Sequence, residues 1–438
     1  MTKNTESLLQ APPADPLFSL LAEANERRNN GQKVLEILLG VYRNDDGSPH
    51  TMPAVAEAQR RLGAGITEDT NPEYLPAGGN PRFVKNVLET IWFEKAGLAE
   101  VQDRIAAIGT SSGTAAISIC ASCLERMAEM TGKPVRIHLS DPTFHTHIER
   151  FSKRSKFETR RYPYLADTTT ASVQNLTSNF DLHPQKINCV MLQASCHNPT
   201  GIDYTDDQVH ELIDFFKQAD FKNDSLVLIL DLAYQGEGRG FLEDSLLVRE
   251  AAKAKIPTFV CYSLSKNSTL YKHRTGALLY LAGDPKYRDT MQAIMSNEGR
   301  NLTGPPSAYG EEVFNTIHDD SRLKSMWLDN VTGVRNSLNG RRTELDQNLA
   351  QLHPQISTGH GFFSVLEGIS AQDLVDLKDS FRDSRNNELV SIMLPAGFPR
   401  LCFGSGGGPD YSRLLAEGLQ WVNKRRSAIR EAALNPKD

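Results

Sequence analysis

A lysine set among serines carries the clearest chemical signal in this chain. The stretch is Ser263-Leu264-Ser265-Lys266, and Arg274 follows the lysine by eight residues. A lysine amine can form a Schiff base with an aldehyde, while hydroxyls and a guanidinium can hold a phosphate. The group therefore suits an aldehyde cofactor that carries a phosphate, a description that pyridoxal phosphate meets. Taken alone, the same stretch is equally typical of a solvated surface lysine.

Asp231 is the second candidate, because it ends the apolar run Leu226–Leu230. A carboxylate at a buried strand end can be a metal ligand, a general base or a structural acid. For a pyridine cofactor it would keep the ring nitrogen protonated, so that the ring can withdraw electrons from a substrate. Phe144, in another loop, could stack on such a ring or belong to the core.

Two loops complete the set of candidates. Asn198 lies among the turn dipeptides Asn-Pro and Thr-Gly, which on their own predict only a tight loop. A functional interpretation places the Asn198 amide and the Tyr234 hydroxyl on the phenolic oxygen of the cofactor. Ser112, Gly113 and Thr114 lie between an expected strand and an expected helix, where backbone N–H groups can bind phosphate. The alternative is an ordinary helix N-cap.

An alternation of strand-like and helical runs must position these residues. Strand-like runs lie at Ile105–Gly109, Val135–Leu139, Phe157–Tyr164, Ile187–Gln193, Leu226–Asp231, Thr258–Ser263 and Gly276–Leu281. Helical runs lie at Pro81–Lys95, Gly113–Met130, Asp206–Gln218, Ser245–Ala254 and Lys286–Met295. This order predicts an α/β domain with a mostly parallel sheet, helices on both faces and the site at the strand ends.

After about Asp320 the pattern changes to that of a smaller α+β domain. Helices are expected at Arg322–Leu352, Ala371–Phe381 and Tyr411–Arg425, and strands at Gly361–Leu366 and Arg400–Phe403. An extended arm at Thr2–Pro16 and a β-type run at Lys33–Tyr42 precede the large domain. The predicted division is an arm with part of the small domain at 1–52, a large cofactor-binding domain at 53–320 and a small domain at 321–438. A ligand cleft is expected between the two domains.

Composition and charge restrict the class of protein. The chain has 438 residues, 39% apolar and 23% charged, as expected for a globular protein of two or three domains. A net charge of −6 argues against nucleic acid or membrane as a partner, and no apolar run reaches the length of a membrane span. Met1–Gln10 shows no targeting pattern, so the cytoplasm is expected. Cys120 and Cys123 form a Cys-x-x-Cys pair in a helical run without a second pair, which predicts buried core thiols and no bound metal.

Taken together and in this order, the motifs resemble those of the fold-type I pyridoxal phosphate enzymes, and specifically the aspartate and aromatic aminotransferase family. The resemblance spans nearly the whole chain, from Ala11–Pro16 through Leu39–Arg43 to Arg400. Its most specific motifs are Cys-His-Asn-Pro-Thr-Gly-Ile-Asp, Ala-Tyr-Gln-Gly and Ser-x-Ser-Lys-Asn. It implies a homodimeric transaminase that moves an amino group from an aspartate-type or aromatic amino acid to a 2-oxo acid such as 2-oxoglutarate, in ping-pong order.

The resemblance also implies a role for each matched residue. Lys266, Asp231 and Tyr234 are the expected catalytic residues: Lys266 forms the Schiff base and then acts as acid and base, and Asp231 pairs with the pyridine nitrogen. The other expected cofactor contacts are Asn198 with Tyr234 at the phenolic oxygen, Ser112, Gly113, Thr114, Ser263, Ser265 and Arg274 at the phosphate, Phe144 on the ring, His147 behind Asp231, and Tyr74, which reaches the phosphate of the neighbouring subunit. At the substrate, the resemblance implies Arg400 on the α-carboxylate, together with Gly40, Asn198, Phe144 and Arg300.

Two departures from the family pattern concern the substrate. Phe144 stands where the family has a stacking tryptophan, and so it lacks the indole N–H. The stretch after Arg300 is one residue shorter than the family's Arg-x-x-x-Ser-Asn-Pro-Pro, whose arginine holds the distal carboxylate of a dicarboxylic substrate. Arg300 either reaches that carboxylate or points elsewhere, so aromatic and other neutral amino acids stay open as substrates.

Two other classes of protein compete with the transaminase prediction. A lyase or an oxidase could act on an amino acid with the same scaffold and cofactor. A cofactor-free binding module descended from the fold would be expected to lack Lys266 or Asp231, and both residues are present.

Overall fold

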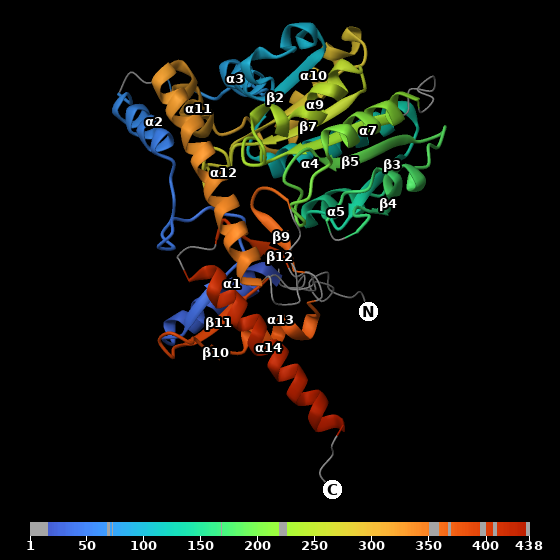
Figure 1. The fold of residues 1–438 in the computed structure, drawn as a ribbon. Helices are drawn as coiled ribbons and strands as arrows, with labels where there is room; N and C mark the ends of the chain where they lie inside the picture. Colours follow the sequence, from blue (N-terminus) through green and yellow to red (C-terminus); the bar gives the residue numbers. More distant parts are fainter. Residues whose placement is uncertain are drawn as a thin grey trace, which may run out of the picture.

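A seven-stranded sheet forms the centre of the larger part of the computed structural model (Figure 1). The structure describes residues 16–67, 71, 73–167, 169–218, 226–349, 359–366, 369–394, 400–405 and 410–434. The strands are β2 (Ile105–Thr110), β3 (Val135–Asp141), β4 (Phe157–Pro163), β5 (Ile187–Gln193), β6 (Leu226–Leu232), β7 (Thr258–Ser263) and β8 (Gly276–Leu281). Their order is β2-β8-β7-β6-β5-β3-β4, and only β8 runs antiparallel to its neighbours. The prediction of a mostly parallel sheet is confirmed.

Helices cover both faces of this sheet, because successive side chains along a strand point to opposite faces. On β6, Val227 and Ile229 belong to one core and Leu228 to the other. The first core packs against α4 (Gly113–Thr131), α5 (His145–Ser152) and α10 (Arg288–Thr303), and the second against α3 (Pro81–Ile91), α7 (Asp206–Gln218), α9 (Leu246–Lys253) and α11 (Ala308–Asp319). Cys120 and Cys123 are buried free thiols of the first core, as predicted.

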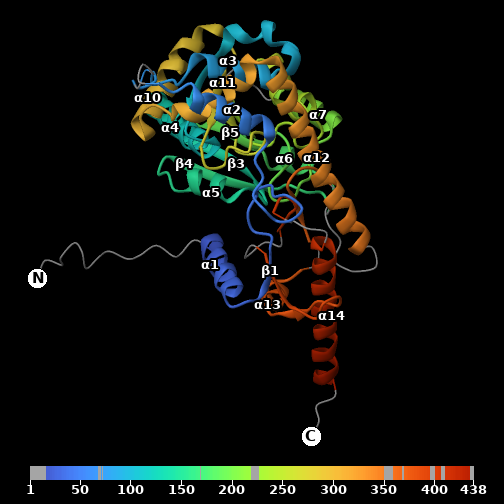
Figure 2. The ribbon, with the colours of Figure 1, turned by 90° about the vertical axis from the view of Figure 1, so that its left-hand side faces the viewer.

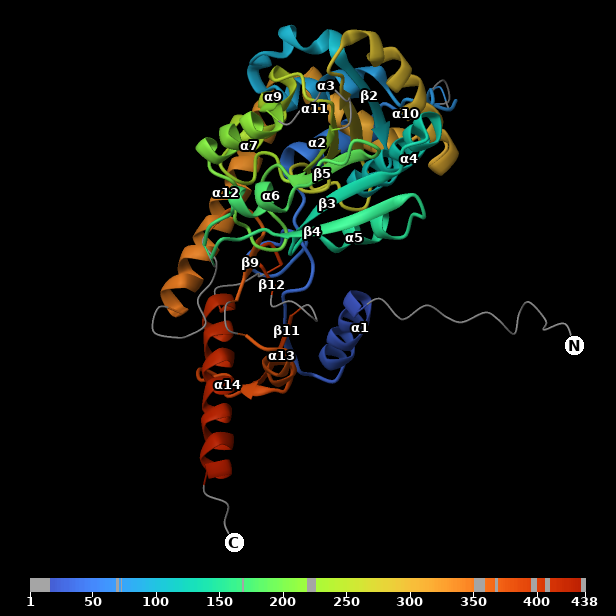
Figure 3. The same ribbon diagram turned by 90° about the vertical axis from the view of Figure 1, so that its right-hand side faces the viewer.

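A second, smaller part lies below the sheet in Figure 1. β1 (Lys33–Glu36) pairs in parallel with β11 (Leu389–Met393), which pairs antiparallel with β10 (Phe381–Arg382), so an N-terminal strand joins C-terminal ones in one sheet. β9 (Phe363–Val365) and β12 (Arg400–Cys402) form a separate antiparallel ladder nearer the large sheet. The helices α1 (Pro16–Asn29), α13 (Ala371–Lys378) and α14 (Tyr411–Leu434) complete this part, and α14 runs away from the sheet (Figures 2 and 3). Apart from Pro16, the predicted arm lies outside the described residues.

The long helix α12 (Ser321–Leu349) links the two parts (Figure 1). Its first half packs against α2 (Pro53–Ala64) and α11, and Nε1 of Trp327 donates to the Asn267 carbonyl at 2.7 Å. In its second half, Arg342 donates to the carbonyl of Phe363 on β9 at 2.8 Å. A single helix therefore contacts both the segment next to Lys266 and the ladder that carries Arg400. Although α12 and α14 are long, no helix among the described residues is apolar enough to cross a membrane.

Glu311 on α11 is a fully buried carboxylate beside the sheet. Its Oε2 accepts a hydrogen bond from the Asn80 N–H at 2.9 Å, while Oε1 has no donor within the described ranges. A Cβ built on Gly109 of β2 would lie 2.0 Å from Oε1, so the backbone encloses the carboxylate tightly. Burial raises the pKa of Glu311 to about 8, with help from the Glu312 carboxylate and against the effect of the Asn80 hydrogen bond.

We expect Glu311 to make the protein less stable as the pH rises from about 4.5 to about 8. The folded state keeps the Glu311 proton up to about pH 8, whereas the unfolded chain releases it near pH 4.5. Between these two pH values the free energy of unfolding therefore falls by up to about 1.4 kcal/mol for each pH unit. Glu311→Gln keeps the shape of the side chain but cannot ionise. As the pH rises from about 4.5 to about 8, the melting temperature of Glu311→Gln should therefore increase relative to that of the wild type. A difference between the two melting temperatures that does not change with pH would contradict the expectation.

Candidate active site

The carboxyl ends of the parallel strands bring the predicted cofactor residues together. Asp231 on β6 lies opposite Gln193 of β5 and Cys261 of β7 in the sheet register. Ser263 ends β7, and Asn198 follows β5 in a loop fixed by two 2.9 Å hydrogen bonds between its backbone and the Gln193 side chain. Ligands of open α/β sheets bind beyond the carboxyl ends of the strands, so these side chains share one site.

A buried histidine holds Asp231. Nε2 of His147 lies 2.9 Å from Oδ2 of Asp231, and Nδ1 of His147 lies 3.0 Å from the Thr143 hydroxyl. A neutral ring that donates from Nε2 and accepts at Nδ1 satisfies both contacts. Phe144 stands edge-on to the His147 ring, with 5.5 Å between the centroids. Oδ1 of Asp231 makes no hydrogen bond within the described residues, so one carboxylate oxygen is free for a ligand.

The N-terminus of α4 forms one wall of the site. Ser112 caps this helix, and its Oγ accepts a hydrogen bond from the Ala115 N–H at 3.1 Å. A Cβ built on Gly113 would lie 2.8 Å from Cβ of Ser263, so the helix end touches the end of β7 directly. Thr114 follows and is partly exposed. Backbone N–H groups at such a helix end favour an anion.

Hydroxyl groups and a guanidinium lie beside this helix end. The Ser265 N–H donates to Oγ of Ser263 at 3.2 Å, and Nη1 of Arg274 donates to Oγ of Ser265 at 3.3 Å. Nη1 of Arg274 also donates to the Tyr271 carbonyl at 3.2 Å. In the described part of the chain, Arg274 forms no ion pair, so its charge is available to an anion held here.

Lys266 lies between this cradle and the smaller part of the molecule. Its Nζ donates to the Gly40 carbonyl at 2.5 Å and lies 5.2 Å from the centroid of the Tyr271 ring and 5.9 Å from that of Tyr234. Burial lowers the pKa of Lys266 to about 8, although the Glu237 carboxylate raises it. About a tenth of the amine is thus neutral at pH 7, and the neutral form is the one that can act as a nucleophile or a base.

Arg400 on β12 lies next to Asn198 and contributes a guanidinium to the site. Its Nη1 donates to Oδ1 of Asn198 at 3.1 Å and its Nη2 to the Leu38 carbonyl at 2.7 Å, and its Cζ lies 4.4 Å from the centroid of the Phe363 ring. Within the described ranges no carboxylate pairs with Arg400, and its buried Nε has no hydrogen-bond partner. A guanidinium held in place without a counter-ion suits a carboxylate ligand.

Two predicted site residues lie outside this cluster. Tyr74 is 93% exposed, and Arg300 is exposed on the last turn of α10. Neither side chain bonds to the cluster in the described structure, whereas the other predicted residues gather around Lys266, Asp231 and Arg400.

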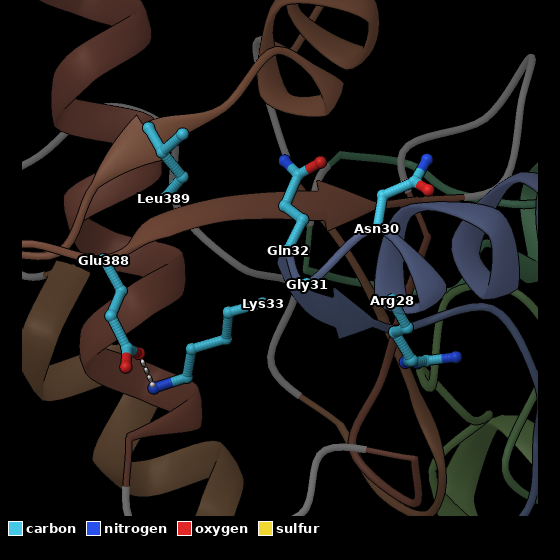
Figure 4. Close-up of a pocket in the computed structure, with 7 residues that line it drawn as sticks. All are labelled: Arg28, Asn30, Gly31, Gln32, Lys33, Glu388 and Leu389. Atoms are coloured by element: carbon cyan, nitrogen blue, oxygen red, sulfur yellow. Dashed lines mark ion pairs between the residues drawn. The ribbon is translucent and has the colours of Figure 1, made fainter.

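The pocket in Figure 4 is separate from the cluster. It lies where β1 meets β11, and it is lined by Arg28, Asn30, Gly31, Gln32, Lys33, Glu388 and Leu389. None of the predicted site residues lines it. Nζ of Lys33 lies 3.8 Å from the Glu388 carboxylate, so the two charges in the pocket pair with each other. The lining residues do not indicate a catalytic or binding function.

Sequence reasoning missed aromatic residues beside Lys266 and Arg400, among them Tyr271, Phe362 and Phe363, and it missed the buried Glu237. Tyr271 lies between Lys266 and Arg274, so the spacing of that motif could have revealed it. Glu237 follows the Ala-Tyr-Gln-Gly motif directly, but a charged residue in a glycine-rich turn is ordinarily exposed. No sequence pattern signals its burial.

Comparison with known proteins places the chain in a family. A family model described as aminotransferase class I and II matches residues 35–410, and the chain belongs to this family. It is 31% identical over 380 residues to a tyrosine aminotransferase of Klebsiella pneumoniae, covering 85% of this chain and 91% of the relative. It is 29% identical over 358 residues to a cytoplasmic aspartate aminotransferase of Schizosaccharomyces pombe, covering 80% and 83%. A solved aromatic amino acid aminotransferase from Burkholderia cenocepacia superposes with a TM-score of 0.81 at 25% identity, covering 96% of this chain and 100% of that one.

The protein is therefore a pyridoxal phosphate-dependent transaminase with the fold-type I architecture. The residues of the site fit this cofactor. The amine of Lys266 suits its aldehyde, and the oxygen of Asp231 that makes no hydrogen bond within the described residues suits a protonated ring nitrogen. The N–H groups at the α4 N-terminus, with the hydroxyls of Ser263 and Ser265 and the Arg274 guanidinium beside them, suit a phosphate.

Gly113→Ala is expected to destabilise the protein. The new Cβ would lie 2.8 Å from Cβ of Ser263, so the N-terminus of α4 must move, and overpacking of this kind costs about 1–3 kcal/mol. Gly333→Ala is the matched control, because nothing lies within 4 Å of its Cβ position on α12 and alanine should stabilise the helix by about 0.5–1 kcal/mol. The two melting temperatures should shift in opposite directions. A Gly113→Ala protein as stable as the wild type would contradict the close contact.

Proposed function

We propose that the enzyme transfers the amino group of an aspartate-type or aromatic amino acid to a 2-oxo acid such as 2-oxoglutarate, in two half-reactions of ping-pong order. The observation that carries this proposal is that Arg400, which has no carboxylate partner among the described residues, shares a site with the Lys266 amine, whose pKa is lowered. One group suits an α-carboxylate and the other suits proton transfer at the adjacent carbon. The relatives named tyrosine and aspartate aminotransferase support the two substrate classes.

Pyridoxal phosphate supplies an aldehyde that condenses with amines and a ring that stabilises negative charge on the neighbouring carbon. Asp231, backed by His147, would face its ring nitrogen, and Phe144 would lie against the ring. Asn198 and Tyr234 would contact its phenolic oxygen, and Ser112, Gly113, Thr114, Ser263, Ser265 and Arg274 would hold its phosphate. Burial raises the pKa of Tyr234 well above its usual value, so its hydroxyl keeps the proton and can donate it in a hydrogen bond.

Arg400 and Lys266 would divide the work on the substrate. The planar fork of Arg400 can bind both oxygens of an α-carboxylate, which fixes the bond at the α-carbon that faces Lys266. Lys266, as a neutral amine, can take the proton from that carbon and return it elsewhere. The Gly40 carbonyl, 2.5 Å from Nζ, would orient the amine beside the substrate.

The active unit is proposed to be a homodimer with shared sites. Tyr74 is exposed and would reach the phosphate in the site of the other subunit. Within a subunit we place the domain boundaries at residues 52 and 320. The molar mass measured by light scattering would be that of two chains.

A cytoplasmic location is proposed, as for the relative from S. pombe.

A visible absorbance spectrum, recorded while single amino acids are added without an oxo acid, tests the proposed function. Conversion of the yellow band into the shorter-wavelength pyridoxamine band is expected, and the fastest amino acid identifies the donor class. Release of ammonia or peroxide without a new amino acid would overturn the proposal in favour of a lyase or an oxidase.

Arg300→Ala is expected to raise the KM for aspartate and glutamate while sparing aromatic amino acids, if Arg300 binds the distal carboxylate. A charge-assisted contact of this kind contributes about 1.5–3 kcal/mol, which corresponds to roughly 10- to 150-fold in kcat/KM. Arg126 on α4, which is also an exposed arginine, provides the control. Arg126→Ala should leave kcat/KM unchanged for both substrate classes. An equal loss for both classes in Arg300→Ala would exclude this role.

A further inference from the structure

Gln193 is a buried amide for which the proposed function gives no role. It is the last residue of β5, and its Cα lies opposite that of Asp231 in the sheet register. The N–H of the next residue, Ala194, donates to the Asp231 carbonyl at 2.8 Å. The backbone that carries the Gln193 side chain is therefore fixed to the strand that carries Asp231.

Both ends of the Gln193 amide bond to the backbone of a single residue, Asn198. Oε1 of Gln193 accepts a hydrogen bond from the Asn198 N–H at 2.9 Å, and Nε2 of Gln193 donates to the Asn198 carbonyl at 2.9 Å. Within the described residues no other group bonds to the Asn198 backbone. A pair of hydrogen bonds from one planar group fixes the direction of its partner as well as its position.

The residues that precede Asn198 are held by a different group. The Asp203 carboxylate accepts hydrogen bonds from the Cys196 N–H at 2.9 Å and from the His197 N–H at 3.0 Å. The loop therefore has two separate supports, one from Asp203 and one from Gln193. The Gln193 side chain acts on Asn198 alone.

The Asn198 side chain faces Arg400. Nη1 of Arg400 donates to Oδ1 of Asn198 at 3.1 Å. A guanidinium has only donors, so the oxygen of the Asn198 amide must face it, and Nδ2 is directed away from it. Within the described residues Nδ2 makes no hydrogen bond, so its N–H groups are available to a ligand. One amide thus supports the guanidinium with its oxygen and offers a donor on its other edge.

On the proposed roles of Asn198 and Arg400, we infer that Gln193 is a positioning residue that acts through Asn198. By fixing the Asn198 backbone, it sets the direction of the Arg400 guanidinium and of the N–H donor for the phenolic oxygen of pyridoxal phosphate. Gln193 changes no covalent bond and transfers no proton. Its effect is to keep the group that binds the substrate carboxylate in register with the group that binds the cofactor.

Loss of the Gln193 contacts should affect the cofactor and the substrate in two distinct ways. A donor to the phenolic oxygen stabilises the negative charge there most when the nitrogen that joins Lys266 to the cofactor has lost its proton. With Asn198 displaced, that nitrogen should keep its proton to a higher pH. A displaced Asn198 also leaves the Arg400 guanidinium without one of its two hydrogen bonds, so carboxylates should bind less tightly.

Gln193→Met tests the inference in the full-length protein with bound pyridoxal phosphate, because methionine has a similar length and cannot bond to the Asn198 backbone in this way. The visible cofactor band is titrated with pH in the absence of amino acid and oxo acid. Its midpoint should rise by about 0.5 to 1 pH unit, as expected for partial loss of a hydrogen bond to a charged oxygen. The KM for amino acid and oxo acid should each rise by roughly 3- to 10-fold, while kcat falls by a smaller factor. Gln193→Ala removes the same two bonds and serves as a second variant if Gln193→Met folds poorly.

Asn188 provides a matched control near the other end of β5. Its Oδ1 accepts from the His183 N–H at 3.0 Å and its Nδ2 donates to the His183 carbonyl at 3.0 Å, which repeats the Gln193 pattern away from the site. Asn188→Leu removes these bonds and should lower the melting temperature. It should leave the midpoint of the cofactor band and both KM values at those of the wild type.

A wild-type midpoint or wild-type KM values in folded Gln193→Met would overturn the inference, and so would equal changes in Asn188→Leu. The titration requires no turnover. If the amino acid test identified a lyase or an oxidase, the midpoint would still report on Gln193, so the two failures can be told apart.

Discussion

Lys266→Ala is expected to abolish turnover and to remove the visible absorbance band of the bound cofactor. The amine of Lys266 is the only one proposed to react with the cofactor aldehyde, and it is also the proposed base, so one substitution removes two functions. The loss in kcat should be about 10⁴-fold or more.

The measurement for Lys266→Ala is kcat with the best amino acid and oxo acid, together with the spectrum of the same sample. Lys272→Ala is the matched control, because Lys272 is an exposed lysine in the same loop. It should keep both the band and the activity. Normal activity in Lys266→Ala would refute the proposed site.

Arg400→Lys is expected to have the second largest effect, although it keeps the positive charge. A lysine can no longer donate to Asn198, to the Leu38 carbonyl and to both oxygens of a carboxylate at the same time. Breaking a buried, hydrogen-bonded charge pair costs about 2–5 kcal/mol. This corresponds to roughly 30- to 4000-fold in kcat/KM.

The loss in Arg400→Lys should appear for amino acids and oxo acids alike, because both carry the α-carboxylate. The visible band should persist, since Lys266 and the phosphate cradle are unchanged. Arg425→Lys, at an exposed arginine of α14, is the control and should behave as the wild type. A loss confined to one substrate class would show that Arg400 binds something other than the shared carboxylate.

Most strands of the large sheet could be predicted closely from the sequence, because they are short apolar runs buried on both faces; the edge strand β4, which carries charged and half-buried residues, is the exception. β5, β7 and β8 have the predicted bounds. The helices were less well defined at their ends. Helix α10 was expected to stop at Met295 but runs to Thr303 through Gly299, where a Cβ would already lie 3.4 Å from Ile108. The glycine allows close packing on the sheet there, which a propensity argument treats as a break.

Elements that depend on distant partners could not be predicted. β11 was missed because it gains its place by pairing with β1, which lies more than 350 residues earlier in the chain. For the site, Lys266, Asp231 and Arg400 were recognisable from their motifs. The buried Glu237 was not, because its burial depends on the turn that Asp244 fixes around it. The roles of Tyr74 and Arg300 stay predictions, because both side chains are exposed and lie away from the cluster within one chain.

Helix α12 has a consequence for which changes this chain can tolerate. Trp327 binds the segment beside Lys266 and Arg342 binds the ladder that carries Arg400, about 22 Å apart along the helix axis. The helix thus fixes the distance between the segment beside Lys266 and the strand that carries Arg400. One inserted residue would advance its second half by about 1.5 Å and turn it by about 100°, moving Arg342 away from β9. Substitutions can accumulate on the exposed face of α12, whereas insertions and deletions within it would change the spacing between the segment beside Lys266 and the ladder that carries Arg400.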